Sequence, residues 1–342
     1  MSLSAASFAS PFVVFMGDIG DRVYGKTGLG LVQWRSTDCI GQVRLPGCGV
    51  DTGVPDVDAA TAKARGARTL IVGSAAVGGG LPDHWVASLC EAALAGLDIV
   101  AGLHISLASL PGLAQAARVG GVRLVDVRVP PARIPVGTGR KRAGRRVLMV
   151  GTDCAVGKKY AALALARDLQ AAGFAADFRA TGQTGIMIAG TGMPMDAVVA
   201  DFLTGAAEML SPDNAPDHWD VIEGQGGLFH PGYAPVTLGL LVGSQPDAFV
   251  VCHDPMRTQI AGWPSYALPT VEELIERTML LGYQSNPAIR CVGLALNTSA
   301  VPAGSRAALM ARYAAATGLP CVDPILDGMA PIVARLRTAF PS

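Results

Sequence analysis

Apolar runs of strand length and stretches of helical periodicity alternate along this chain. In the first 130 residues the apolar runs lie at 12–16, 39–45, 69–73, 98–103 and 123–127. Helical patterns separate most of them, at 55–67, 84–97 and 107–119. A strand that returns about every 25 to 30 residues with a helix in between predicts a parallel sheet with right-handed crossovers. We expect a Rossmann-like domain, although the GxGxxG dinucleotide fingerprint is absent.

The second half of the chain repeats this alternation. Strands are predicted at 146–150, 176–181, 219–223, 248–252, 290–296 and 320–323. Helices are predicted at 158–172, 196–210, 235–243, 270–281, 304–317 and 328–339. The basic, Pro/Gly-rich stretch VPPARIPVGTGRKRAGRR has no periodicity and is interpreted as a solvated linker. The alternative is that one or two of Arg140, Lys141 and Arg142 help to hold an anionic ligand. The predicted organisation is an α/β protein with a Rossmann-like domain at 1–130, a linker at 131–145 and a doubly wound domain at 146–342.

The second domain opens with a strand, a loop of small residues, a Gly-Lys pair and a helix that ends near Gly173. This is the layout of a phosphate-binding loop, in which backbone N–H groups and a lysine face an anion. The residues predicted to bind a phosphorylated ligand are Gly151, Thr152, Asp153, Cys154, Ala155, Val156, Gly157, Lys158 and Lys159. Cys154 at the helix start near Lys158 is either a small loop residue or a thiol with a lowered pKa.

The loop departs from the common form of the motif in two ways. Five residues rather than four separate Gly151 from Gly157, and Lys159 stands where Ser or Thr is usual. That hydroxyl normally ligates the magnesium ion of a nucleotide triphosphate. The sequence therefore predicts phosphate binding without ATP hydrolysis.

Composition narrows the classes of function. The formal net charge is zero and 16% of the residues are charged, which gives no electrostatic basis for binding nucleic acid. No apolar run reaches membrane-spanning length, and the first residues do not resemble a signal peptide. The seven cysteines show no metal-ligand spacing, so we expect a cytoplasmic, reduced protein without a metal. Because half of the residues are hydrophobic, we also expect a homo-oligomer.

Three loops that follow predicted strands carry chemically active side chains. They are RATGQTG from Arg179, DVIEGQGGLFHP from Asp220, and HDPMR from His253. Because ligands bind at the carboxyl ends of parallel strands, we expect these loops to lie beside the phosphate loop. In the first domain, Lys26-Thr27 and the glycines at 78–80 occupy similar places, with a solvated turn as the alternative for Lys26-Thr27.

Several of these segments resemble known P-loop proteins. GTDCAVGK resembles the GTDTxVGKT loop of dethiobiotin synthetase, and VIEGQGG resembles the VEGAGG of dethiobiotin and cobyrinate synthetases. In those enzymes the glutamate helps to hold magnesium. GLALNT at 293–298 resembles the segment that positions a nucleotide base in such folds.

The whole chain resembles a narrower group, a two-domain P-loop family long filed as a domain of unknown function. The resemblance rests on the GD…KT opening, GTDCAVGKK, ATGQTG, EGQGGLFHPGY and HDPMRTQIAGWPSY. Members of that family include D-glutamate N-acetyltransferases of D-amino-acid catabolism. The resemblance implies an enzyme that moves the acetyl group of acetyl-CoA to the amino group of a D-amino acid, and acetyl-CoA carries phosphates that a magnesium-free loop could bind.

This chemistry suggests a role for each polar side chain. Glu223 and His230 are the candidate general bases that would take a proton from the substrate ammonium, and glycine amides at 224–227 could stabilise the oxyanion. Arg179 and Arg257, with Gln183 and Thr184, could bind a diacid substrate. The alternatives are a loop cap for Glu223, a turn residue for His230, and internal pairing of the arginines with Asp177 and Asp254.

Two other functions remain open at this point. One is an ATP- and Mg²⁺-dependent ligase or kinase that uses Lys158 and Glu223. The other is a non-enzymatic regulator that binds a nucleotide or CoA without turnover.

Overall fold

The computed structural model describes residues 8–75 and 81–341, which fall into two compact units. The N-terminal unit contains the described residues from Phe8 to Pro130 together with Gln183–Pro194. The C-terminal unit contains Pro131–Gly182 and the chain from Met195 onward. The predicted range of 146–342 for the second domain did not anticipate this excursion. The glycines at 78–80 lie outside the described residues.

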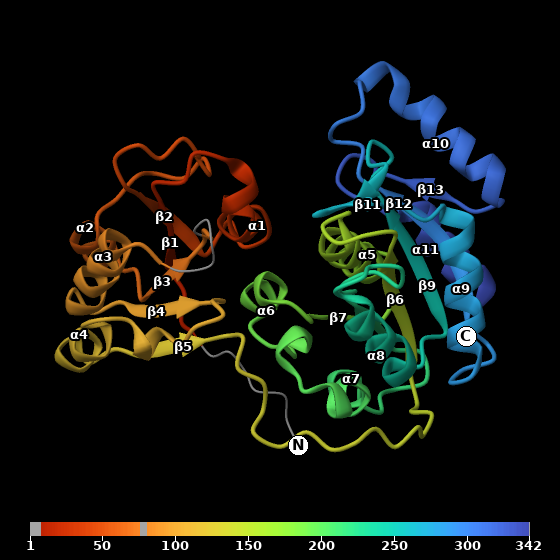
Figure 1. Cartoon of the computed structure of the whole chain (residues 1–342), viewed down its shortest axis with the longest axis horizontal. Helices are drawn as coiled ribbons and strands as arrows, with labels where there is room; N and C mark the ends of the chain where they lie inside the picture. Colours follow the sequence, from red (N-terminus) through yellow and green to blue (C-terminus); the bar gives the residue numbers. More distant parts are fainter. Residues whose placement is uncertain (1–7, 76–80, 342) are drawn as a thin grey trace. The chain divides into compact units, whose positions relative to one another are not determined.

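The N-terminal unit is built on a parallel sheet whose described strands follow the order β2-β1-β3-β4-β5. The strands are β1 (Phe12–Gly17), β2 (Cys39–Arg44), β3 (Thr69–Val72), β4 (Asp98–Ala101) and β5 (Leu124–Asp126). The helical segments are η1 (Arg22–Gly25), α1 (Lys26–Trp34), α2 (Ala59–Ala64), α3 (Asp83–Leu94), η2 (Leu107–Ser109), α4 (Leu113–Gly120) and α6 (Gln183–Ala189). Within this unit α1 and α6 lie on one side of the sheet, and α2, α3 and α4 on the other (Figure 1).

β1 is apolar along its whole length because it lies in the middle of the sheet. Every residue of FVVFMG is buried, because a strand in the middle of a parallel sheet is covered by helices on both faces. The strand ends at Gly17, whose φ of +60° is the left-handed conformation that favours glycine. A Cβ atom at this position would come within 2.3 Å of the buried Trp85 ring. Trp85 of α3 therefore closes the end of the strand.

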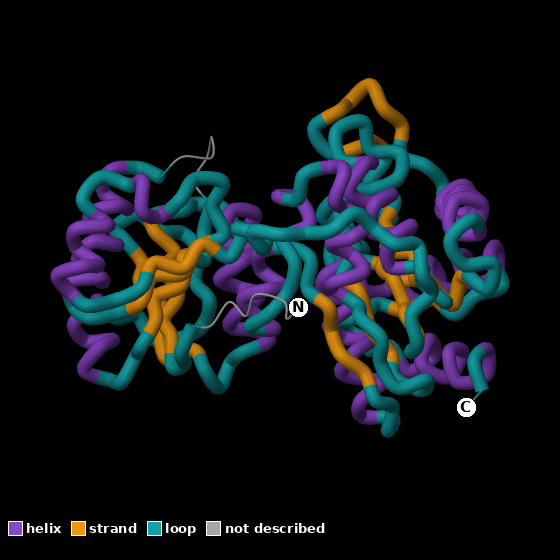
Figure 2. Tube along the Cα trace, turned by 90° about the horizontal axis from the view of Figure 1, so that it is seen from below, coloured by secondary structure: helices purple, strands orange, loops and turns teal. Residues whose placement is uncertain are grey.

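The C-terminal unit is also built on a parallel sheet, with the described strands in the order β13-β12-β9-β6-β8-β7. Its strands are β6 (Arg145–Gly151), β7 (Ala176–Arg179), β8 (Trp219–Ile222), β9 (Ala248–His253), β12 (Arg290–Leu296) and β13 (Cys321–Val322). Its α-helices are α5 (Lys158–Ala171), α7 (Leu203–Leu210), α8 (Ala234–Ser244), α9 (Val271–Tyr283), α10 (Ala303–Thr317) and α11 (Ala330–Ala339). In Figure 2 helices flank the strands of each unit. The predicted α/β class is confirmed, with parallel sheets in both units.

Three elements of the structure differ from the predicted ones. The predicted helix at 196–210 is divided into η3 (Met195–Ala197), η4 (Ala200–Phe202) and α7. The segment QTGIMIA, of which QTG was assigned to a predicted loop, forms α6, whose buried apolar residues pack in the N-terminal unit. An antiparallel pair, β10 (Gln259–Ile260) and β11 (Trp263–Ala267), was missed because it is short and mostly exposed. Within the described residues, no helix combines the length and apolar character needed to cross a membrane.

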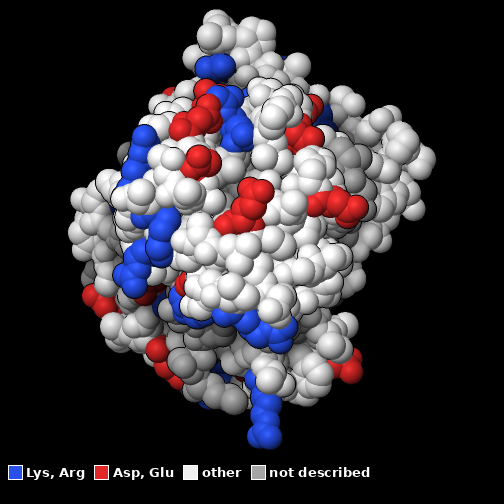
Figure 3. Space-filling model, turned by 90° about the vertical axis from the view of Figure 1, so that its left-hand side faces the viewer, with Lys and Arg blue, Asp and Glu red and all other residues white. Residues whose placement is uncertain are grey.

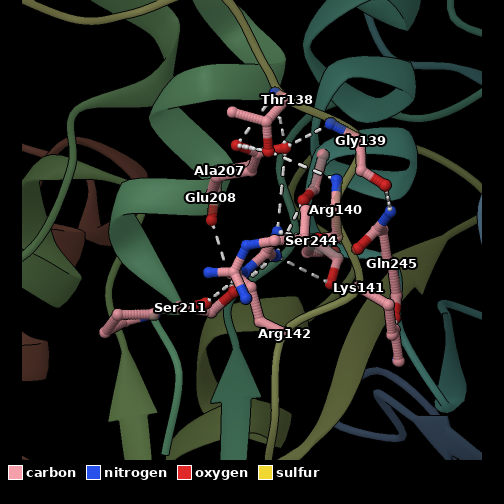
Figure 4. Close-up of polar contacts among 12 residues, drawn as sticks. Thr138, Gly139, Arg140, Lys141, Arg142, Ala207, Glu208, Ser211, Ser244 and Gln245 are labelled. Atoms are coloured by element: carbon pink, nitrogen blue, oxygen red, sulfur yellow. Dashed lines mark hydrogen bonds and ion pairs between the residues drawn. The ribbon is translucent and has the colours of Figure 1, made fainter.

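The basic linker is not the solvated connection that its composition suggested. Arg142 is buried and donates hydrogen bonds to the carbonyls of Ser211, Gly243 and Ser244, at the carboxyl ends of α7 and α8 (Figure 4). Carbonyls at a helix end lack partners within the helix and carry partial negative charge, so a guanidinium stabilises them. Burial lowers the pKa of Arg142 to about 10.

Other residues of the segment tie it down further. Glu208 of α7 accepts the backbone N–H groups of Thr138 and Gly139, each at 2.9 Å (Figure 4). Lys141 bonds Asp247 at 2.8 Å, and Arg140 pairs with Asp213. The basic run is therefore a clamp on the C-terminal unit, in which Arg140, Lys141 and Arg142 each have protein partners.

Candidate functional site

The predicted phosphate loop connects β6 to α5. Within the sheet, β7 and β8 lie on one side of β6, and β9, β12 and β13 lie on its other side. The strand order therefore reverses next to β6. Gly157, the residue before α5, has a φ of +107°, and Ala155 also has a positive φ of 55°. Left-handed residues inside a tight loop turn successive backbone N–H groups toward one concavity, which suits an anion. The loop lies at the crevice where ligands bind in open α/β sheets.

Lys158 is the first residue of α5, and its ammonium is buried among the loops. Its Nζ donates to the carbonyls of Asp153 and Gly226, both at 2.7 Å. Burial lowers the pKa of Lys158, because a low-dielectric environment disfavours the charged form. Because the hydrogen bonds that this buried ammonium makes within the described residues go to neutral carbonyls, it is well placed to bind an incoming anion.

Glu223 follows β8 and is 4% exposed. Its Oε2 accepts the backbone N–H groups of Thr181 at 2.8 Å and Gly182 at 3.1 Å. Its Oε1 accepts no hydrogen bond from the part of the chain that the structure describes. Burial raises the pKa of Glu223, against the lowering effects of these amides and of Lys159 and Lys158. The residue is thus a rigidly held carboxylate with one oxygen available and with more basic character than an exposed glutamate.

Asp153 links the phosphate loop to the HDPMR segment. Its Oδ2 accepts Arg257 Nη1 and the backbone N–H of Ala261, each at 2.8 Å, and its Oδ1 accepts the N–H of Cys154 at 2.6 Å. Arg257 Nη1 also donates to the Cys154 carbonyl at 2.6 Å. The arginine therefore pairs mainly with Asp153, whereas Asp254 lies 3.9 Å from its Nη2. The third predicted loop does reach the phosphate loop, as expected.

His230 lies on the turn after Glu223 and is 1% exposed. Its Nδ1 accepts the backbone N–H groups of Gly232 and Tyr233, both at 3.1 Å. The rings of Tyr233 and Trp263 pack on it with centroid separations of 4.5 and 4.6 Å. Burial lowers the pKa of His230, which favours the neutral imidazole.

A second buried histidine, His253 at the end of β9, touches the loop from the other side. Its Nδ1 lies 3.0 Å from Thr152 Oγ1 and its Nε2 lies 2.9 Å from the hydroxyl of Tyr313 in α10. The motifs drew attention to His253 but not to Tyr313, which lies in a helical pattern far along the chain. No local signal marks Tyr313, because only the sheet topology brings α10 to this edge.

Other predicted site residues lie elsewhere. Arg179 donates its Nε to Asp220 Oδ1 at 2.7 Å, two positions back along the paired strands, so its charge points away from the phosphate loop. Gln183 and Thr184 belong to the N-terminal unit, where Thr184 Oγ1 lies 2.7 Å from Thr27 Oγ1. For Cys154, burial raises the pKa of the thiol, which favours the small loop residue over the alternative of a thiol with a lowered pKa.

Among the described residues, two groups of side chains have the composition of metal ligands. Asp153, Cys154 and His230 form one, and Asp177, His218 and Asp220 form the other. In each group an arginine already binds a carboxylate, namely Arg257 on Asp153 and Arg179 on Asp220. A guanidinium at that distance opposes a cation, so we assign a metal to neither group.

Comparison with known proteins assigns this two-domain architecture to a family. The model described as "Domain of unknown function (DUF1611_C) P-loop domain" matches residues 135–333, and the corresponding Rossmann-like N-terminal model matches residues 43–130. The chain belongs to the DUF1611 family. The loop, the EGQGG turn and the HDPMR segment described above all lie within the matched P-loop domain of this family.

DUF1611 relatives and a solved structure match the chain over nearly its whole length. A protein of Tritonibacter scottomollicae named D-glutamate N-acetyltransferase is 44% identical, over 96% of this chain and 98% of its own. A protein of the same name from Pseudoalteromonas is 42% identical, over 95% and 98%. The crystal structure of a DUF1611 family protein from Anabaena variabilis is 33% identical with a TM-score of 0.84, over 96% and 99%.

Proposed function

We propose that this protein transfers the acetyl group of acetyl-CoA to the amino group of D-glutamate, as a step in the breakdown of D-amino acids. The names of the two relatives at 44% and 42% identity support an N-acetyltransferase. The observation that carries the proposal is the pairing, in one unit, of a phosphate loop lacking the magnesium hydroxyl with the buried carboxylate of Glu223.

The phosphate loop suits the CoA part of the donor. CoA carries a pyrophosphate and a 3′-phosphate, which the loop amides and the Lys158 ammonium could hold by charge-assisted hydrogen bonds. Lys159 occupies the position of the hydroxyl that would ligate magnesium, so a lysine supplies positive charge where a nucleotide triphosphatase uses a metal. Binding of this kind needs no hydrolysis and no divalent ion.

Glu223 suits the role of general base. Attack on the thioester requires the amino group of the substrate in its neutral form, so a base must remove a proton from the ammonium. Oε1 of Glu223 is available for that proton, and the amides on Oε2 keep the carboxylate in one orientation. The amine then attacks the carbonyl carbon, its nitrogen gives up a second proton, and the C–S bond breaks. The CoA thiolate that leaves takes up this second proton, and the first stays with the base until it passes to solvent. Amides at 224–227 are our candidates for stabilising the oxyanion.

Arg257 is our candidate for binding a carboxylate of the diacid. Its Nη1 donates to Asp153 and to the Cys154 carbonyl, whereas Nη2 lies 3.9 Å from Asp254 Oδ2, beyond hydrogen-bond distance. The Arg257 side chain is 22% exposed, so part of it is accessible to a ligand. Arg179, held on Asp220, drops out of the proposed site.

The test is acetyl transfer measured by mass spectrometry with acetyl-CoA and D-glutamate, in EDTA and without ATP. We expect N-acetyl-D-glutamate and free CoA in equal amounts, with L-glutamate as the matched control substrate. Product that forms only with Mg-ATP would support a ligase or kinase instead. Tight binding of CoA without product from any amino acid would support a regulator.

Four broader expectations, on location, assembly and two kinds of partner, are also proposals. We propose a cytoplasmic homo-oligomer that acts on a small molecule and does not bind nucleic acid. On the face in Figure 3, basic side chains gather along the left edge and the lower part, but acidic side chains lie beside them and across the centre, so this face is not uniformly basic. Size-exclusion chromatography with light scattering would test the oligomer directly.

A further inference from the structure

His230 has one ring nitrogen that is fully used and one that is not. Its Nδ1 accepts two backbone N–H groups, so the proton of the neutral ring is on Nε2. This Nε2–H is buried and has no hydrogen-bond partner among the residues that the structure describes. Leaving a buried donor unsatisfied costs about 1–3 kcal/mol, so such a group calls for an explanation.

The nearest carboxylate oxygen is Asp153 Oδ1, at 3.8 Å from Nε2. That separation is too long for a hydrogen bond. The imidazole cannot shift to close it, because Tyr233 and Trp263 pack on the ring and two amides hold Nδ1. Any shortening must therefore come from a movement of Asp153, which belongs to the phosphate loop.

Asp153 is restrained by the lysine that would bind the ligand. Lys158 Nζ donates to the Asp153 carbonyl at 2.7 Å. A phosphate that enters the loop would compete for this ammonium with a full negative charge, and a charge-assisted hydrogen bond is stronger than one to a neutral carbonyl. Once Lys158 turns to the phosphate, the Asp153 backbone loses that restraint.

We propose that His230 is a positioning residue for the phosphate loop: its Nε2–H bonds Asp153 Oδ1 when a phosphorylated ligand engages Lys158, and so fixes the loop in its bound conformation. The inference rests on the phosphate-binding part of the proposed function. It also gives His230 a role other than general base, because the free nitrogen already carries a proton and the other is occupied. Glu223 then remains the base.

Two substitutions separate the two ring nitrogens. In His230→Asn the amide oxygen can replace Nδ1 and accept the N–H groups of Gly232 and Tyr233, but no group replaces Nε2–H. In His230→Gln the longer side chain carries an N–H to the position of Nε2, but the acceptor at Nδ1 is lost. One variant thus removes the proposed function of the ring, and the other removes its anchoring.

The measurement is titration calorimetry with CoA, repeated with inorganic pyrophosphate, alongside thermal unfolding. We expect His230→Asn to bind CoA about tenfold more weakly, equivalent to about 1.4 kcal/mol, with an unfolding temperature close to that of the wild type. His230→Gln should unfold at a lower temperature yet keep CoA affinity within about twofold. His218→Asn is the control, since His218 is also buried in this unit but precedes β8 and contacts Asn214 and Asp177.

In steady-state kinetics His230→Asn should raise KM for acetyl-CoA and change kcat by less than about threefold. In NMR spectra the Nε2–H proton of wild-type His230 should move downfield when CoA is added, as a new hydrogen bond forms. Unchanged CoA affinity in His230→Asn, or an unmoved Nε2–H resonance, would overturn the inference. Wild-type protein that binds neither CoA nor pyrophosphate would overturn the phosphate-loop proposal and this inference together.

Discussion

The two units differ in what they bury. In the described part of the N-terminal unit the buried polar side chains are neutral, namely Gln42, Thr69, Ser74 and Thr184. In the C-terminal unit the buried residues include seven ionisable side chains besides histidine: Arg142, Arg146, Asp153, Lys158, Asp220, Glu223 and Asp323. Burying a charge costs several kcal/mol unless partners compensate it. The difference indicates that the C-terminal unit carries the reactive groups, and substitutions in the two units should therefore have different consequences.

Of all the substitutions, Glu223→Gln should have the largest effect, and that effect should be a loss of catalytic rate. The amide keeps the shape of the side chain and can still accept from Thr181 and Gly182, but it cannot take a proton. We expect kcat to fall by about 10²–10⁴-fold, with acetyl-CoA binding largely retained. In the wild type kcat/KM should fall as the pH drops through the raised pKa of Glu223, and the variant should lack this acidic limb.

Stability gives an independent check on Glu223. A folded-state pKa above the unfolded value means that the carboxyl stabilises the fold most when protonated, and that this contribution is lost as the pH rises through the folded pKa. At neutral pH Glu223→Gln should therefore be no less stable than the wild type in urea unfolding. Near-full kcat in the variant would move the base elsewhere, with His253 or Asp254 next in line.

The second prediction concerns ligand binding through Lys158. Lys158→Ala removes an ammonium whose hydrogen bonds, within the described residues, go to the carbonyls of Asp153 and Gly226. We expect CoA affinity to fall by about 1.5–3 kcal/mol, the range for hydrogen bonds to a charged group. Calorimetry against CoA and against Mg-ATP would measure the change. If neither affinity changes, the loop does not bind phosphate.

The third prediction uses a buried charge that we assign to structure alone. Arg142→Met keeps the apolar stem but leaves the carbonyls of Ser211, Gly243 and Ser244 without their donor. The free energy of unfolding of the C-terminal unit should fall by about 1.5–3 kcal/mol. CoA affinity of the folded protein should not change, because this clamp lies apart from the loop. A selective loss of CoA affinity would mean that the basic segment does serve the ligand.

The fourth prediction moves to the N-terminal unit. Gly17→Ala places a methyl group 2.3 Å from the Trp85 ring at a residue with a φ of +60°. Overpacking of this kind costs about 1–3 kcal/mol, which thermal unfolding of this unit should show. The loop chemistry of the C-terminal unit should be preserved, so CoA should bind with wild-type affinity at temperatures where the variant is folded.

The smallest effect tests a residue that the motifs assigned to the substrate. Thr184→Val removes one of the two hydroxyls in the Thr27–Thr184 pair. We expect a loss of about 0.5–1.5 kcal/mol in stability, the net value of a hydrogen bond, and an unchanged KM for D-glutamate. A raised KM with unchanged stability would instead return Thr184 to the substrate site and blur the contrast between the units.

The sequence by itself determined the elements and the loop. The period of the apolar runs specifies parallel strands and crossover helices, because burial on both faces of a sheet demands apolar strands at regular intervals. Glycine at 157 and lysine at 158 mark the phosphate loop because a positive φ and a mobile charge belong to specific residue types. These are local requirements, and a sequence displays local requirements directly.

Only the tertiary structure decided the partners of the charged side chains. No residue near Arg142 in the sequence indicates that it binds the carboxyl ends of two helices. Arg179 likewise pairs with Asp220 and not with the phosphate loop. The excursion of Gln183–Pro194 to the other unit was equally invisible, because α6 is short and its partner α1 lies far away in sequence. A buried charge or an apolar helix takes whichever partner the fold brings within about 3–4 Å, and that choice depends on topology rather than on sequence neighbours.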